Sequence, residues 1–165
     1  MTLSQAANLA PLAIAAIALC ALGAALWSIN AQKRLARRRA AIDFFLRTEM
    51  DEKMLQALEN YLVAVKELKD VKSIEEFETT ESYRHIRAYL NIHELLAVGI
   101  HNKVFDRQVC YDFWGDVLLN GCRDCIRVID HVRRKPMGTY TYFDLLKLRK
   151  RWSSPKRLFP KWRRG

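Results

Sequence analysis

The chain has 165 residues and a net charge of +10, from 28 Lys and Arg against 18 Asp and Glu. Five of the basic residues lie at 33–39 and nine at 147–165, so residues 40–146 carry 14 basic groups against all 18 acids. This distribution argues against a basic nucleic-acid-binding domain and is typical of a protein whose two ends meet a membrane surface.

The segment from Ala6 to Ile29 is predicted to be a transmembrane helix. It supplies 24 positions without Asp, Glu, Lys or Arg, and about 20 apolar residues suffice to cross a bilayer. A cleaved signal peptide would carry positive charge before its apolar run, whereas Met1–Asn8 holds no charged side chain. A soluble helix is seldom apolar on every face over this length. A membrane span is therefore favoured over both alternatives.

Small residues in this span recur on roughly one helix face, at Ala16, Cys20, Gly23 and Ala24. Such spacing lets two membrane helices approach closely, so a homo-oligomer through the span is one reading. An Ala-rich run produces the same spacing by chance, and a lone helix that faces lipid is the favoured interpretation.

A basic collar follows the span and consists of Lys33, Arg34, Arg37, Arg38 and Arg39. Positive charge on one side of a span marks the cytoplasmic side, so residues 31–165 are predicted to be cytoplasmic. The protein would then be a single-pass inner-membrane protein with its N-terminus outside. The collar is also expected to bind anionic lipid head groups, at about 1 kcal/mol per residue near the surface.

The remaining pattern predicts an all-α fold, with a cytoplasmic bundle of four or five helices after the anchor. No glycine occurs between Gly23 and Gly99 and no proline between Pro11 and Pro136, which favours long helices. Apolar spacing and caps predict these helices: the anchor continued to about Arg47, then 51–69, a short turn after Ser73, 81–99, 107–119 after Asp106, 122–135 and 142–152. Breaks are expected at Gly99–Lys103 and at Asn120-Gly121, and Thr141 with Asp144 is expected to start the last helix.

These predictions divide the chain into four segments. They are a transmembrane anchor at 1–30, a basic juxtamembrane helix at 31–50, a cytoplasmic helical domain at 51–152 and a basic aromatic tail at 153–165.

Asn91, His93 and Glu94 interrupt an apolar helix and form a candidate polar cluster. A zinc-protease motif fails here because its second histidine position holds Ala97. The cluster could contact a ligand or partner, but a buried polar network with a solvated histidine is the favoured interpretation.

Cys122 and Cys125, with His131 and Cys110 nearby in sequence, have ligand types that suit zinc. They lie inside helical periodicity, without the turn that a zinc knuckle uses, so a metal-binding domain is kept only as an alternative. A cytosolic location also makes disulfides improbable. No phosphate-binding loop, dinucleotide fingerprint or nucleophile elbow is present, so we predict neither a cofactor nor an enzymatic activity.

The tail interleaves basic and aromatic residues. The predicted lipid-contacting residues are Lys156, Arg157, Lys161, Trp162, Arg163 and Arg164, with the Phe159 and Trp162 rings at the membrane interface. A disordered basic tail is the plainer alternative. Single-stranded nucleic acid uses the same residue types and is the least favoured partner.

The stretch Arg87–Asp106 contains Leu90-Asn91-x-x-Glu94, then Gly99-Ile100 and Asp106. It resembles the hallmark of an uncharacterised family of small bacterial and prophage proteins, known only as a domain of unknown function. The resemblance implies a helical cytoplasmic domain on a membrane anchor and carries over no activity. The leading hypothesis is a membrane-anchored, non-enzymatic interaction or accessory protein with an unknown protein partner; a membrane-tethered nucleic-acid binder and a metal-binding domain are the alternatives.

Overall fold

The computed structural model describes residues 3–154, with side chains from Ile14 onward. This part of the chain is all-α and contains no strand, as the sequence predicted. The seven helices are α1 (Leu3–Met50), α2 (Glu52–Asp70), α3 (Ile74–Phe77), α4 (Glu81–His101), α5 (Arg107–Asp124), α6 (Ile126–Arg134) and α7 (Phe143–Trp152). Six helices follow α1, where four or five were predicted.

The described residues divide into two units, one up to Arg37 and one from Arg38 onward. In the first unit, α1 alone is long and apolar enough to be a membrane span or a signal sequence, by length and composition. None of its most apolar window is buried within the protein. The rest of this section concerns the second unit.

Carboxylate caps fix the starts of two long helices, and the one at Asp106 was predicted from the sequence. Asp51 accepts hydrogen bonds from the backbone N–H groups of Lys53 at 2.9 Å and Met54 at 3.1 Å. Asp106 does the same for Gln108 and Val109, both at 3.0 Å. Each cap satisfies amides that have no partner within the first turn of the helix.

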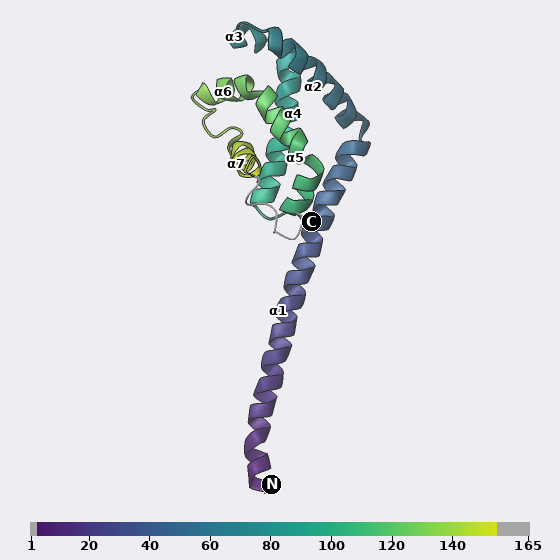
Figure 1. Cartoon of the computed structure of the whole chain (residues 1–165), viewed down its shortest axis with the longest axis vertical. Helices are drawn as coiled ribbons and strands as arrows, with labels where there is room; N and C mark the ends of the chain where they lie inside the picture. The colour runs from purple at the N-terminus through teal and green to yellow at the C-terminus, as the bar shows by residue number, and fades with distance from the viewer. Residues whose placement is uncertain (1–2, 155–165) are drawn as a thin grey trace. The chain divides into compact units, whose positions relative to one another are not determined.

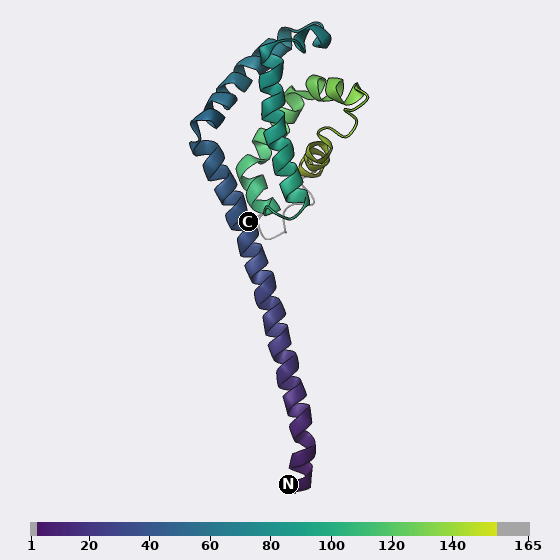
Figure 2. The ribbon, with the colours of Figure 1, turned by 180° about the vertical axis from the view of Figure 1, so that it is seen from behind.

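Helix α4 lies at the centre of the second unit, between α2 on one side and α7 on the other (Figure 1). The opposite view shows the same order (Figure 2). Helix α5 packs beside α4 and also contacts α7. The last turns of α1 lie along α5, where the Phe45 ring stacks on Phe113 with centroids 4.7 Å apart and Phe44 meets Trp114 edge-on at 6.0 Å.

Helix α6 closes the far end of the unit against α2 and α3. The Arg127 guanidinium donates to the backbone carbonyls of Leu68 at 3.2 Å and Val71 at 2.9 Å. These carbonyls lie at the C-terminus of α2, where helix acceptors lack intrahelical partners. Arg127 therefore caps α2 from a different helix.

The break predicted at Gly99–Lys103 is present but starts after His101, and the division predicted at Asn120-Gly121 is wrong. Helix α4 runs through Gly99 to His101, and α5 runs through Gly121 to Asp124. The two glycines instead permit close packing: a Cβ at Gly99 would lie 2.3 Å from the Phe105 ring, and one at Gly121 would lie 3.3 Å from Tyr89. The division between α5 and α6 lies instead at Cys125, and the short α3 accounts for the sixth helix after α1.

Candidate functional site

The predicted polar cluster is divided between two faces of α4. Asn91 and Glu94 lie toward α7, whereas His93 lies toward α5. On the α7 side, the Arg87 Nε–H donates to the Tyr142 hydroxyl oxygen at 2.7 Å. That hydroxyl in turn donates to Asn91 Oδ1 at 3.3 Å. Asn91 is therefore engaged within the fold.

Glu94 caps the start of α7. Its carboxylate accepts from the backbone N–H of Leu145 at 2.8 Å and of Asp144 at 3.4 Å. Tyr142, the residue that begins the helix, has φ of 58° and offers no side-chain cap. The predicted cap from Thr141 is therefore replaced by a carboxylate from α4. Burial raises the Glu94 pKa by more than these two donors lower it.

The His93 side chain is buried, with 2% of its surface exposed. Its Nδ1 lies 3.0 Å from the Tyr89 carbonyl oxygen, and its ring stacks on Trp114 with centroids 5.1 Å apart. A carbonyl can only accept, so Nδ1 carries the hydrogen and the unpartnered Nε2 is a bare acceptor. Burial lowers the His93 pKa to about 4, so the ring is neutral at pH 7. The prediction of a solvated histidine was wrong.

The candidate zinc ligands do not meet. No group of three His, Cys, Asp or Glu in the described part of the chain is placed to hold one metal ion. His131 Nε2 instead lies 2.8 Å from a Glu78 carboxylate oxygen, and Lys135 also contacts Glu78. Cys110, Cys122 and Cys125 are free and buried, and burial raises their pKa values to about 12, 12 and 11.

The collar residues Lys33, Arg34, Arg38 and Arg39 are exposed and Arg37 is half-buried. Within the second unit, Arg38 Nε lies 3.7 Å from Asp106 Oδ2. The predicted lipid-contacting residues of the tail, from Lys156 to Arg164, lie outside the described residues.

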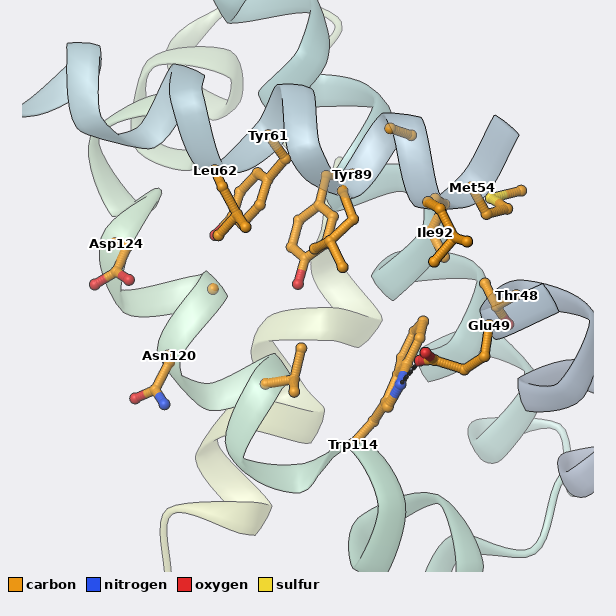
Figure 3. Close-up of a pocket in the computed structure, with 15 residues that line it drawn as sticks. Thr48, Glu49, Met54, Tyr61, Leu62, Tyr89, Ile92, Trp114, Asn120 and Asp124 are labelled. Carbon is orange, nitrogen blue, oxygen red and sulfur yellow. Dashed lines mark hydrogen bonds between the residues drawn. The ribbon is translucent and has the colours of Figure 1, made fainter. Parts of the chain in front are cut away.

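The structure contains a groove that the sequence did not predict. It has a volume of about 380 Å³ and lies among the end of α1, the first half of α2, α4 and α5 (Figure 3). Its lining is Thr48, Glu49, Met54, Leu55, Ala57, Leu58, Tyr61, Leu62, Tyr89, Ile92, Trp114, Val117, Asn120, Gly121 and Asp124.

Three aromatic side chains, Tyr61, Tyr89 and Trp114, line the groove. The Tyr61 and Tyr89 rings stack with centroids 3.6 Å apart and an interplanar angle of 13°. Burial raises the pKa of both hydroxyls, so they remain protonated at neutral pH. The Trp114 indole N–H donates to Glu49 at 3.4 Å, as the dashed line in Figure 3 marks.

The charge of the groove differs from that of the chain. Glu49 and Asp124 are its charged lining residues, and the lining holds no Lys or Arg, although the protein carries +10 overall. The arrangement offers an apolar trough with aromatic walls and an acidic rim. Its chemistry suits binding of an apolar, positively charged segment.

One signal in the sequence could have indicated this groove. Helix α2 carries apolar residues at Met54, Leu55, Leu58 and Leu62, which sequence periodicity assigned to the buried face of an amphipathic helix. All four are exposed, and Leu62 leaves 52% of its surface open. The apolar face of α2 is wider than the contact it makes with α4, and the excess lines the groove.

A protein-family comparison matches residues 15–152 to a domain of unknown function, DUF4760. No curated protein and no solved structure matches the chain.

Proposed function

Because the chain belongs to the DUF4760 family of domains of unknown function, whose description carries no activity, we propose its role from the residues themselves. We propose that it is a single-pass inner-membrane protein with its N-terminus outside. Its helical domain acts in the cytoplasm by binding a partner rather than by catalysis.

The exposed apolar surface of α1 is the observation that carries this proposal. Ile17, Leu22 and Trp27 lie on the part of the helix before the collar, and each is exposed, Trp27 to 71%. Water would be an unfavourable solvent for such a surface, at about 25 cal/mol per Å² of apolar area. Lipid covers an all-round apolar helix without any further protein contact.

The collar supports the orientation. Five basic residues follow the apolar run directly and none precedes it, and cytoplasmic flanks carry such an excess. Four of these residues are exposed and so free to meet anionic head groups.

The hydrogen-bond partners of Asn91 and Glu94 support a binding role over a catalytic one. Both belong to the candidate polar cluster. Asn91 accepts a hydrogen bond from the Tyr142 hydroxyl, and Glu94 accepts from two backbone N–H groups at the start of α7. A general acid or base needs hydrogen-bond reach to a substrate, whereas these groups stabilise a helix junction. The open apolar groove is the feature of the domain that is suited to a partner.

Membrane fractionation with two reporters tests the anchor. The full chain, expressed in bacteria, should remain in the pellet after carbonate extraction and should keep its N-terminal residues by mass spectrometry. A C-terminal green fluorescent protein should fluoresce, and a C-terminal alkaline phosphatase should be inactive. A shortened, extracted chain would identify a signal sequence and overturn the proposal. A variant in which the five basic collar residues are replaced by neutral ones is the matched control, because it removes the charge that sets the orientation.

Turnover would overturn the binding role. If the purified protein converted a substrate and Glu94→Gln abolished the conversion, Glu94 would be catalytic rather than structural. The bacterial or prophage origin implied by the resemblance stays a prediction.

A further inference from the structure

The groove leaves apolar side chains of the domain exposed to solvent. Leu55, Leu58 and Leu62 on α2 line it together with Val117 on α5, and all four side chains are exposed. Contiguous apolar patches of this kind mark interaction sites. The groove is therefore a candidate docking site, and the chemistry of its lining restricts which occupant fits.

Charge complementarity provides the first restriction. Glu49 and Asp124 lie at the rim, and exposed Asp116 lies on α5 two turns before Asp124. No basic side chain lines the groove to oppose a cation. A fitting occupant has apolar side chains flanked by Lys or Arg. Its apolar side chains would be buried in the groove, and its basic side chains would lie near Glu49 and Asp124.

One segment of this chain has that composition. Residues 155–165 contain Leu158, Phe159 and Trp162 among five basic residues, whereas residues 40–146 carry a net negative charge. We propose that this tail occupies the groove of its own chain, with its aromatic side chains against Leu62 and Trp114. This inference goes beyond the proposed function and does not depend on the membrane anchor.

The place where the described chain ends makes this contact reachable. Trp152, in the last turn of α7, is buried and meets the Tyr111 ring edge-on at 5.3 Å. Tyr111 lies one helical turn before Trp114, which lines the groove. The described chain thus ends beside α5. Trp162 follows Ser154 by eight residues, eight extended residues span about 26 Å, and a helix with its side chains is about 10–12 Å across, so Trp162 can reach around α5.

Occupation in cis would have a direct consequence. A tethered segment acts at a local concentration that reaches millimolar for a short linker, so the tail would exclude a weaker amphipathic helix from the groove. The same basic and aromatic residues would then be withheld from anionic lipid.

Disulfide trapping in the full chain tests the proposal. The trap pairs Leu62→Cys with Trp162→Cys in a Cys20→Ala background, in nanodiscs of phosphatidylethanolamine and phosphatidylglycerol under a mild oxidant. The three remaining native thiols are buried with raised pKa values, so they contribute little background. The matched control pairs Trp162→Cys with Met137→Cys, because Met137 is 99% exposed and lies outside the groove.

We expect an intrachain link in the Leu62 trap that forms about tenfold faster than in the Met137 control, since the groove raises local concentration. Glu49→Gln with Asp124→Asn should slow it about two- to fivefold, the range of partly exposed charge pairs. Asp130→Asn, an exposed acid on α6, should not change the rate. Circular dichroism melting of each variant checks that the domain is folded.

Three results would overturn the proposal. Trapping at the control rate would show that the tail does not occupy the groove. A link between two chains would assign the groove to a second copy. A fluorophore on the single variant Trp162→Cys that is quenched by brominated lipid, with trapping at the control rate, would place the tail in the bilayer.

Discussion

Glu94 on α4 accepts a hydrogen bond from the backbone N–H of Leu145, 51 positions later, at 2.8 Å. The contact joins the stretch Arg87–Asp106, which carries the family resemblance, to the start of the last helix. A side chain from another helix thereby replaces the local cap that α7 lacks. Docking of α7 and formation of its first turn are consequently coupled.

Truncating Glu94 should destabilise the domain. Glu94→Ala leaves two N-terminal amides of α7 without an acceptor and should lower the free energy of unfolding by about 1–2 kcal/mol. Glu94→Gln should cost less, because an amide oxygen still accepts and no charge is buried. Urea unfolding of the full chain in detergent, followed by tryptophan fluorescence, measures both.

The matched control for Glu94 is Glu59→Ala, an exposed acid on α2, which should leave the midpoint almost unchanged. Equal effects of the Ala and Gln variants would contradict the cap as the source of the stability.

Local patterns in the sequence were sufficient to predict most of the helices. The spacing of apolar residues and the cap at Asp106 depend on neighbours within a few positions, so they can be recognised without knowing the fold. The division predicted at Asn120-Gly121 was wrong for the opposite reason. Gly99 and Gly121 lie inside helices where a Cβ would meet Phe105 and Tyr89, and sequence alone does not show which neighbours meet.

The candidate site was less predictable for the same reason. Asn91, His93 and Glu94 lie within four consecutive positions, but the helical rotation between them places His93 on a different face of α4 from the other two. The groove depends on how far α2 diverges from α5, which no local propensity encodes. The exposed Leu55 and Leu58 were visible in the sequence only as part of an apolar face.

His93 should make the fold sensitive to mild acid. Its folded pKa of about 4 lies below the ordinary 6.5, so the unfolded chain binds the proton more tightly. The stability from neutral His93 is present above pH 6.5 and is lost as the pH falls toward 4. Between pH 7 and 5 the loss should be on the order of 2 kcal/mol. Urea unfolding at each pH measures it.

The control for that pH dependence is His93→Phe, which keeps a flat ring against Trp114. The difference in unfolding free energy between wild type and this variant should shrink or reverse as the pH falls. A difference that does not change with pH would mean that His93 is accessible to solvent protons in the folded state.

Gly99→Ala should be destabilising even though alanine favours helices. The added Cβ would lie 2.3 Å from the Phe105 ring, and the ring would have to move from a packed position beside Phe44. Overpacking of this kind costs about 1–3 kcal/mol. Gly23→Ala is the control, because nothing lies within 4 Å of its added Cβ. Thermal melts followed by circular dichroism compare them, and equal melting temperatures would contradict the close approach of Phe105.

The buried cysteines should resist alkylation until the domain unfolds. With pKa values of about 12 for Cys110 and Cys122 and about 11 for Cys125, each thiolate is scarce at pH 8. Modification should be at least about a hundredfold slower than for an ordinary thiol of pKa near 8.5. Mass spectrometry after maleimide treatment, with and without denaturant, measures this.

A chelator separates burial from metal coordination as the cause of that protection. Zinc-bound thiolates become reactive when the metal is removed, whereas buried thiols do not respond to a chelator. We expect the three cysteines to stay unmodified in native protein with EDTA. Rapid labelling of Cys122 and Cys125 on adding EDTA would instead indicate a metal site, and it would contradict the arrangement in which His131 is bound to Glu78.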